Sequence, residues 1–391
     1  MKTTYSIIVL VILSLSVSCN LKKAEILPTA DQQATAEAVE LFSRLMKLQE
    51  KGIMYGHQDD LMYGHTWWYK PGRSDIKEMV GDYPAMVGFE LGEIETGRER
   101  SLDSVSFVQI TEQVKLFHKM NGIITISWHA INPITSQYPG EKKPNGAGSA
   151  WDVRTLSADS LNAVKSILPG GENHELFNQW LTILADYFLT WKDENGKLIP
   201  FIFRPYHEHS GRFFWWGDTR CTDEEYAELW RYTVLFLREK GLHNILYAYN
   251  TDKVYSLEQF MRGYPGDEYI DMLSIDWYGS GQEFNEAIDK ALFFAEQSAK
   301  EKNKLFALSE CGPITSDLLE ILKKYTVSHL LTWRNVPLPN LSELEKEADF
   351  DEKKLEESMM NLPYYSSKKT IVEEMYNDPH YLFLKDIQDI W

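Results

Sequence analysis

Cysteine and positive charge are both scarce in this chain of 391 residues. Its three cysteines are Cys19, close to the N-terminus, Cys221 and Cys311, which are too few for a disulfide framework. Against 58 Asp and Glu there are 40 Lys and Arg, and the net charge of −18 argues against nucleic acid or an anionic membrane surface as a partner. No interior run is long enough to span a membrane, and no tract is of low complexity. A neutral partner fits this composition better.

Short apolar runs recur eight times along the sequence. They are rich in β-branched and aromatic residues and lack strict polar alternation, which is typical of buried parallel strands, and most gaps between them are long enough for a helix. Eight such units predict a single (β/α)₈ barrel, a TIM barrel, over residues 30–391. The predicted strands are Ile53–Gln58, Pro84–Leu91, Ile123–His129, Phe201–Glu208, Asn244–Asn250, Asp271–Gly279, Leu305–Gly312 and His329–Asn335.

The segments between and around these runs supply the predicted helices. Ala30–Gln49 is amphipathic and is expected to cover the bottom or side of the barrel. Asn162–Trp191 and Glu283–Lys302 also have helical patterns, and Glu373–Trp391 is predicted to be the last helix. Asn132–Ser149, rich in Pro, Gly and Asn, is predicted to be a loop at the top of the barrel.

Nearly every predicted strand ends in a residue that can do chemistry. In a (β/α)₈ barrel the C-terminal ends of the strands form one face, and catalytic groups gather there. The sequence therefore predicts that a site is assembled from residues far apart in the chain: His57, Glu90, His129, Glu208, Asn250, Tyr278, Glu310 and Trp333.

Glu208 and Glu310, on the fourth and seventh strands, are the strongest catalytic candidates. Strands four and seven face each other across the barrel mouth, so their ends can hold two carboxyl groups across a cleft. Cleavage of a glycosidic bond with retention needs one carboxylic acid and one carboxylate about 5–5.5 Å apart. The acid must stay protonated near neutral pH, and donors such as Arg204 and Tyr278 are expected to keep the nucleophile ionised.

Two long segments around this pair resemble glycoside hydrolase family 26, the β-mannanases. Arg204–Gly211 (RPYHEHSG), with Phe213–Gly217 (FFWWG), is similar to the acid/base segment of that family, and Phe306–Gly312 (FALSECG) to its nucleophile segment. Shorter strings match further strands, and the resemblance runs from about Gly52 to Asn335. These strings are Gly52–Gln58, Ser127–His129, Asp276–Tyr278 and Thr332–Trp333.

The resemblance implies a role for individual residues. Glu208 would be the general acid/base, Glu310 the nucleophile, His207 a residue that sets the environment of the acid, and Tyr278 a donor to the nucleophile. The remaining implied residues line the sugar site: His129, Trp151, Phe213 and Trp333. Because Glu208 and Glu310 would supply both steps of a double displacement, no metal or cofactor is expected.

At three positions the chain departs from the family pattern. Phe213 stands where Trp is common, His209 replaces the usual Met, and Cys311 follows the nucleophile where an aromatic residue is often found. Each departure leaves the arrangement of sugar subsites, and hence the mode of attack, open.

The leading prediction is an endo-acting retaining β-1,4-mannanase that takes mannan, glucomannan, galactomannan or manno-oligosaccharides. Alternatives are an exo-acting enzyme that releases mannobiose, a β-glucanase or xylanase of the same family, and, least favoured, a lipoprotein that binds glycan without cleaving it. A zinc site built from histidines is also disfavoured, because neighbouring strand positions point to opposite faces and a Glu208 in the site turns His207 and His209 away. His57 and Glu90 are predicted to be structural, whereas Asn250 could either contact sugar or cap its strand.

The N-terminus has the pattern of a secretory leader. A basic start is followed by the short apolar run Ile7–Leu15 and then by Leu15–Cys19 (LSVSC), which resembles a bacterial lipobox. We expect residues 1–18 to be a signal peptide, Cys19 to carry lipid, and residues 19–29 to be a tether. Because no acidic cluster follows Cys19, a lipid-anchored envelope protein facing the periplasm is favoured over one on the cell surface.

Overall fold

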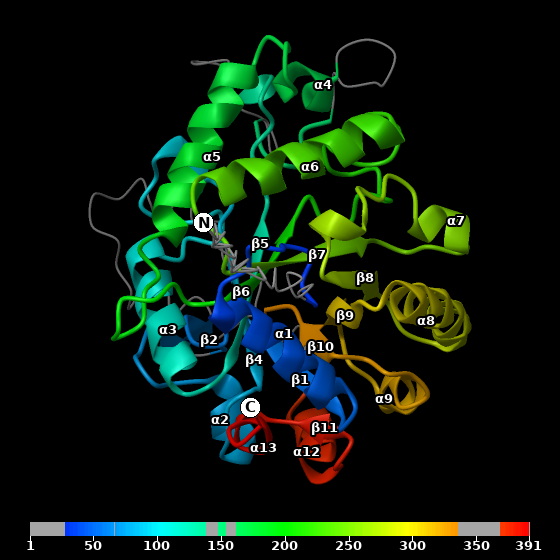
Figure 1. The fold of residues 1–391 in the computed structure, drawn as a ribbon. Coiled ribbons are helices and arrows are strands. Elements are labelled where there is room, and N and C mark those ends of the chain that lie inside the picture. The colour runs from blue at the N-terminus through cyan, green and yellow to red at the C-terminus, as the bar shows by residue number, and fades with distance from the viewer. Residues whose placement is uncertain (1–27, 66, 138–147, 154–161, 335–367, 391) are drawn as a thin grey trace, which may run out of the picture.

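The computed structural model describes residues 28–65, 67–137, 148–153, 162–334 and 368–390. Eight parallel strands close into a barrel, with helices packed around its outside (Figure 1). The signal peptide, Cys19 and nearly all of the predicted tether lie outside the described residues. The predicted (β/α)₈ fold is therefore confirmed.

The barrel closes because its first and last strands pair. Each barrel strand is hydrogen-bonded to its neighbours in parallel, and β1 pairs with both β4 and β10. The barrel strands are β1 (Ile53–Gln58), β4 (Met86–Glu90), β5 (Ile123–Trp128), β6 (Phe201–Pro205), β7 (Ile245–Thr251), β8 (Met272–Tyr278), β9 (Leu305–Gly312) and β10 (His329–Thr332). Each lies inside or within one residue of the apolar run that predicted it.

Helices connect the strands and bury the outer face of the barrel. The longer helices are α1 (Ala36–Gln49), α3 (Phe107–Lys119), α5 (His174–Phe188), α6 (Asp223–Glu239), α8 (Gln282–Lys302) and α12 (Lys369–Asn377). Shorter helices are α2 (Asp75–Val80), α4 (Ala163–Ile167), α7 (Leu257–Phe260), α9 (Ser316–Leu322) and α13 (Leu384–Ile387), with 3₁₀ turns at Ile94–Thr96, Thr135–Gln137 and Asp267–Tyr269. A small hairpin joins β2 (Tyr63–Gly64) to β3 (Trp67–Trp68).

The strands are buried on both faces, which explains their continuous apolar composition. Nearly every strand residue is buried, and large aromatic side chains such as Trp128 and Trp277 belong to one core shared by strands and helices. In a closed barrel one face of each strand fills the interior and the other packs against helices, so neither face needs polar alternation.

The C-terminal segment differs from the prediction of one helix over Glu373–Trp391. Helix α12 ends at Asn377, the short strand β11 (Tyr381–Leu382) follows, and α13 comes last. Pro379 lies at this break and disfavours helical backbone at the residue before it. Strand β11 pairs with the start of β1, opposite Ile53 and Met54, so the chain end covers the closed end of the barrel.

Candidate active site

Glu310 enters the barrel mouth through a bulge in β9. Ile275 of β8 pairs with Leu308, but the next residue, Asp276, pairs with Glu310, so Ser309 is the extra residue. A bulge re-aims the side chains beside it. Ser309 and Glu310, although consecutive, both face the interior: the Ser309 hydroxyl lies 2.8 Å from Asp276 Oδ1, and Glu310 meets the Arg204 guanidinium.

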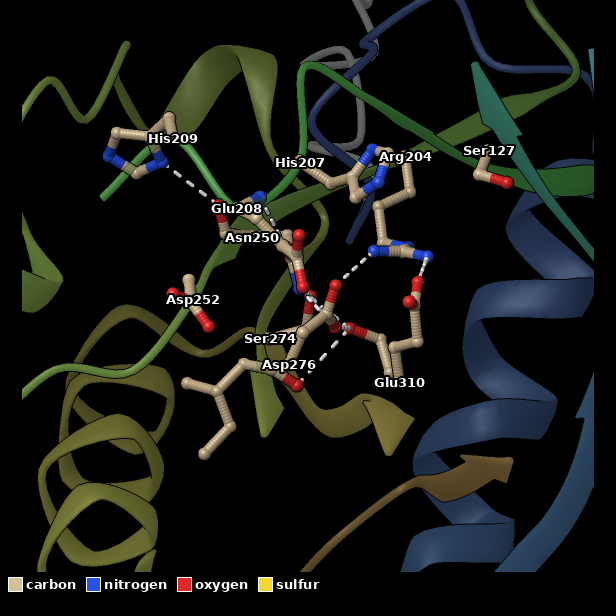
Figure 2. Close-up of polar contacts among 12 residues, drawn as sticks. Ser127, Arg204, His207, Glu208, His209, Asn250, Asp252, Ser274, Asp276 and Glu310 are labelled. Atoms are coloured by element: carbon tan, nitrogen blue, oxygen red, sulfur yellow. Dashed lines mark hydrogen bonds and ion pairs between the residues drawn. The ribbon is translucent and has the colours of Figure 1, made fainter. Parts of the chain in front are cut away.

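Two donors hold the Glu310 carboxylate. Arg204 Nη2 donates to Oε2 at 2.6 Å and the Tyr278 hydroxyl donates to Oε1 at 2.5 Å. Figure 2 shows the Arg204 guanidinium reaching Asp276 and Glu310 at once. These two donors bond to both oxygens of the carboxylate and so fix its orientation. Both donors are those that the sequence predicted for a nucleophile.

Glu208 lies in a tight turn beyond the end of β6. The sequence predicted a strand through Glu208, but β6 ends at Pro205, and both Tyr206 (φ 49°) and Glu208 (φ 54°) have left-handed backbone. Strand alternation therefore stops before these residues. The turn is held by Asn250 of β7, whose Oδ1 accepts a hydrogen bond from the Glu208 backbone N–H at 2.8 Å.

The environment of Glu208 favours its neutral form. Burial raises the pKa of the Glu208 carboxyl well above its ordinary value, and the nearby carboxylates of Glu310, Asp276 and Asp252 raise it further, although Arg204 opposes them. Arg204 donates to Glu310 and to Asp276. The two glutamates thus have contrasting environments, one suited to an acid and the other to a carboxylate.

The two carboxyl groups lie close together. One carboxylate oxygen each from Glu208, Asp276 and Glu310 lie within 4.8 Å of one another. Inverting glycosidases separate their carboxyl groups by about 6.5–9.5 Å to leave room for a water, whereas retaining enzymes hold them about 5–5.5 Å apart. This short separation fits direct attack by one carboxylate on the anomeric carbon.

A cleft of about 440 Å³ opens above this pair. Aromatic side chains line it on several sides, and among them Trp151 is 43% exposed. The structure brings seven residues predicted from the sequence to this lining: His129, Trp151, Glu208, Phe213, Tyr278, Glu310 and Trp333. Arg204 and His207 lie buried behind the lining and contact it through Glu310 and His129.

Glu90 and His207 support His129 from beneath. Glu90 Oε1 accepts the His129 backbone N–H at 2.8 Å, and Glu90 Oε2 lies 2.8 Å from the His129 ring Nδ1. The Nε2 atoms of His129 and His207 are 3.1 Å apart, so one ring donates and the other accepts. Trp151 stacks on His129, with ring centroids 4.9 Å apart. Glu90 is therefore structural, as predicted, and fixes the floor of the cleft.

Sequence reasoning missed several residues of the lining. Asp252 and Lys253 follow the end of β7, and Arg334 follows Trp333, so their places after strand ends were an available signal. Leu102 and Asp103 come from the long connection after β4, and nothing local in the sequence marks them. Phe214, next to Phe213, completes the missed set.

His209 does not join the pair formed by His129 and His207. The His209 ring faces the backbone carbonyls of Asn250 and Arg262, whereas His207 faces His129. Among the described residues, the group with metal-ligating side chains close together is Glu208, Asp276 and Glu310. Two of these three carboxylates are already paired with Arg204.

The barrel mouth holds a carboxyl group with a raised pKa beside a carboxylate bonded by two donors, which is the pair of groups that retaining glycoside hydrolases use. The chain belongs to glycosyl hydrolase family 26, whose family model matches residues 30–347. The family predicted from the sequence is thereby confirmed.

Two characterised relatives are mannan endo-1,4-beta-mannosidases. A mannan endo-1,4-beta-mannosidase of Bifidobacterium adolescentis is 30% identical over 72% of this chain, which spans 28% of that protein's length. A mannan endo-1,4-beta-mannosidase of Bacillus subtilis is 24% identical, over 77% of this chain and 80% of the relative.

Solved structures of the same family superpose over nearly the whole chain. A GH26 beta-mannanase from Bacteroides ovatus is 35% identical, with a TM-score of 0.77 over 90% of this chain and 96% of that one. The modular endo-beta-1,4-mannanase of Cellulomonas fimi is 27% identical, with a TM-score of 0.72, over 92% of this chain and 78% of that one.

Proposed function

We propose that this protein is a retaining endo-β-1,4-mannanase that acts on mannans and manno-oligosaccharides. The observation that carries the proposal is the pair Glu208 and Glu310, with carboxylate oxygens within 4.8 Å, at the bottom of an aromatic cleft. Relatives named as mannan endo-1,4-beta-mannosidases support mannan as the substrate.

In the first step Glu310 attacks the anomeric carbon and Glu208 donates a proton to the leaving group. The Glu310 carboxylate forms a bond to the anomeric carbon while the bond from that carbon to the leaving oxygen breaks, and the Glu208 proton moves to that oxygen. Arg204 and Tyr278 hold Glu310 in position for attack. Burial keeps Glu208 protonated until its proton is used.

In the second step the two residues exchange tasks. Glu208, now a carboxylate, removes a proton from water, whose oxygen bonds to the anomeric carbon as the bond to Glu310 breaks. Glu208 regains its proton and Glu310 its charge, so both groups return to their starting states. Two inversions give net retention of configuration.

Selectivity for mannose is assigned to the wall formed by His129, Trp151 and Tyr278. Mannose differs from glucose by its axial 2-hydroxyl, and a site built to bond that group leaves polar atoms unpaired when the hydroxyl is equatorial. Such a mismatch costs about 1–3 kcal/mol or more. Glu90 and His207 contact the His129 ring on two sides. The ring therefore has a fixed position against which the sugar can be oriented.

Product sizes over time test both substrate and mode of attack. Purified enzyme is incubated with mannan, glucomannan, cellulose and xylan, and the oligosaccharides are resolved at early and late times. Endo attack on mannan gives a broad early distribution of chain lengths, whereas release of mannobiose alone from the start would show exo attack. Equal catalytic efficiency on cellulose or xylan would contradict the mannanase assignment.

Lipid attachment at Cys19, in an envelope protein that faces the periplasm, completes the proposal. Among the described residues no helix is both long and apolar enough to cross a membrane. The first described residues contact the chain near the starts of β7 and β8, where the Ala30 backbone N–H donates to Asp271 Oδ1 at 2.7 Å and His243 contacts Asp31.

Mass spectrometry of the membrane fraction tests the anchor. The mature protein should begin at Cys19 and carry the mass of attached lipid, and Cys19→Ser should move the protein to the soluble fraction without altering its activity on soluble manno-oligosaccharides. A mature chain that retains residues upstream of Cys19 would refute this part of the proposal.

A further inference from the structure

His209 directly follows the proposed acid in sequence, yet its side chain is buried and does not line the cleft. Its ring turns away from Glu310 and contacts the backbone of β7 instead (Figure 2). Nδ1 lies 2.9 Å from the Asn250 carbonyl oxygen and Nε2 lies 2.8 Å from the Arg262 carbonyl oxygen. The ring thus connects the turn after β6 to the end of β7, at Asn250, and to the segment that follows it, at Arg262.

Aromatic residues fix the plane of the His209 ring. Tyr226 of α6 stacks on it, with ring centroids 4.2 Å apart and planes inclined by 18°. The Tyr249 hydroxyl lies 3.0 Å from Nε2 and donates to the Arg262 carbonyl. Because the ring is packed on its face and bonded at its edge, it has little freedom to turn.

Asn250 links His209 to the acid. Its backbone carbonyl meets the His209 ring, and its side-chain Oδ1 accepts the backbone N–H of Glu208. Its Nδ2 donates to Asp276 Oδ1 at 2.7 Å and to Ser309 Oγ at 2.8 Å, beside Glu310. One residue therefore ties the turn that carries Glu208 to the strand that carries Glu310.

This turn needs such support, because Glu208 and Tyr206 both have left-handed backbone, which is costly for residues other than glycine. Strained residues of this kind persist where surrounding contacts over-determine them. We propose that His209 is a positioning residue for the acid/base Glu208. Through its contact with Asn250, His209 holds the Glu208 carboxyl group next to the leaving oxygen. The inference rests on the proposed role of Glu208.

The test separates proton donation from the rest of catalysis. An aryl β-mannobioside with a 2,4-dinitrophenolate leaving group needs no proton, and kcat/KM on it reports only the first step. His209→Phe keeps the stacking ring but removes the two ring nitrogens that contact the Asn250 and Arg262 carbonyl oxygens. We expect kcat on mannan to fall by about 10-fold or more, a fraction of the full effect of a general acid, with KM little changed and kcat/KM on the aryl substrate retained.

Two further variants complete the experiment. His209→Gln keeps an N–H donor and should recover much of the lost activity. His174→Phe is the matched control, since His174 also contacts a backbone carbonyl, that of Ile167 at 2.8 Å, and a tyrosine hydroxyl, that of Tyr232, but lies away from the cleft. It should leave kcat on both substrates unchanged, whatever it does to the melting temperature.

Equal losses of His209→Phe on mannan and on the aryl substrate would overturn the inference, as would no loss on either. If His209→Phe fails to fold, the same comparison is made with His209→Gln. The smaller loss of activity expected for that variant must then appear on mannan and not on the aryl substrate. Glu208→Gln measured in parallel isolates the proposed function. If kcat/KM on the aryl substrate also falls in Glu208→Gln, Glu208 is not the general acid. The proposed function is then wrong, and the result says nothing against His209 in particular.

Discussion

The Tyr278 hydroxyl lies 2.5 Å from Glu310 Oε1 and donates a hydrogen bond to it. Burial raises the pKa of the Tyr278 phenol well above its ordinary value, and the charges of Glu310 and Glu208 raise it further. The hydroxyl therefore stays protonated throughout the working pH range. It can act only as a donor to the carboxylate, which orients one oxygen of Glu310 and leaves the other to Arg204.

Removal of this hydroxyl should slow the first chemical step. Tyr278→Phe keeps the ring and takes away one hydrogen bond to a charged group, which is worth about 1.5–3 kcal/mol. We expect kcat/KM on manno-oligosaccharides to fall about 10- to 100-fold. Tyr325→Phe is the control, because the Tyr325 hydroxyl also donates to a carboxylate, Asp289 Oδ1 at 2.7 Å, outside the cleft. Equal rates for both variants would contradict the role given to Tyr278.

Substitution of the two glutamates should separate their roles. Glu310→Ala should abolish turnover of every substrate, because no nucleophile remains. Glu208→Ala should nearly abolish cleavage of mannan but retain kcat/KM on a substrate whose leaving group needs no proton. Near wild-type rates on mannan from either variant, with folding verified by circular dichroism, would remove the pair from the mechanism.

The stereochemical outcome should be retention. The short separation of the Glu208 and Glu310 oxygens leaves no room for a water between carboxylate and sugar. Proton NMR of the first product, recorded before mutarotation, should show the β-anomer formed from a β-linked substrate. An α-anomer as the initial product would rule out the double displacement.

The strands were predictable because each apolar run is short, buried on both faces and bounded by turn residues. Strands β1 and β9 match their predicted bounds, and β7 and β8 differ from theirs by one residue at each end. Helix ends depended on capping instead: α1 begins at Ala36 rather than Ala30 because Thr35 caps it, its side chain accepting from the Ala38 N–H. Periodicity alone does not reveal such a cap among several polar candidates.

That Glu208 and Glu310 lie close together was also predictable, since both glutamates follow apolar runs, but the turn that presents Glu208 was not. Left-handed backbone at Tyr206 and Glu208 depends on tertiary bonds from Asn250 and on packing, which no local pattern specifies. The same applies to Asp103, which reaches the cleft from a long connection and pairs with Arg334. Cleft residues that directly follow a strand can be inferred from the sequence, whereas cleft residues in long loops can be identified only from the three-dimensional structure.

The alkaline limit of activity should depend on Asp252. The carboxylate of Asp252 lines the cleft and is one of the negative charges that raise the pKa of Glu208, after burial, Glu310 and Asp276. As a general acid Glu208 is active while protonated, so activity is lost as pH rises through its pKa. Asp252→Asn removes a negative charge, which eases ionisation of Glu208 and lowers that pKa.

The alkaline limb of kcat/KM for Asp252→Asn should therefore move to lower pH, by about half a pH unit, which corresponds to ~0.7 kcal/mol. Asp267→Asn is the control, because Asp267 lies in the turn before β8, at the closed end of the barrel. It should leave the limb in place. The measurement is the pH dependence of kcat/KM on a manno-oligosaccharide at constant ionic strength, and a shift to higher pH in Asp252→Asn would show that Glu208 is not the group whose ionisation ends activity.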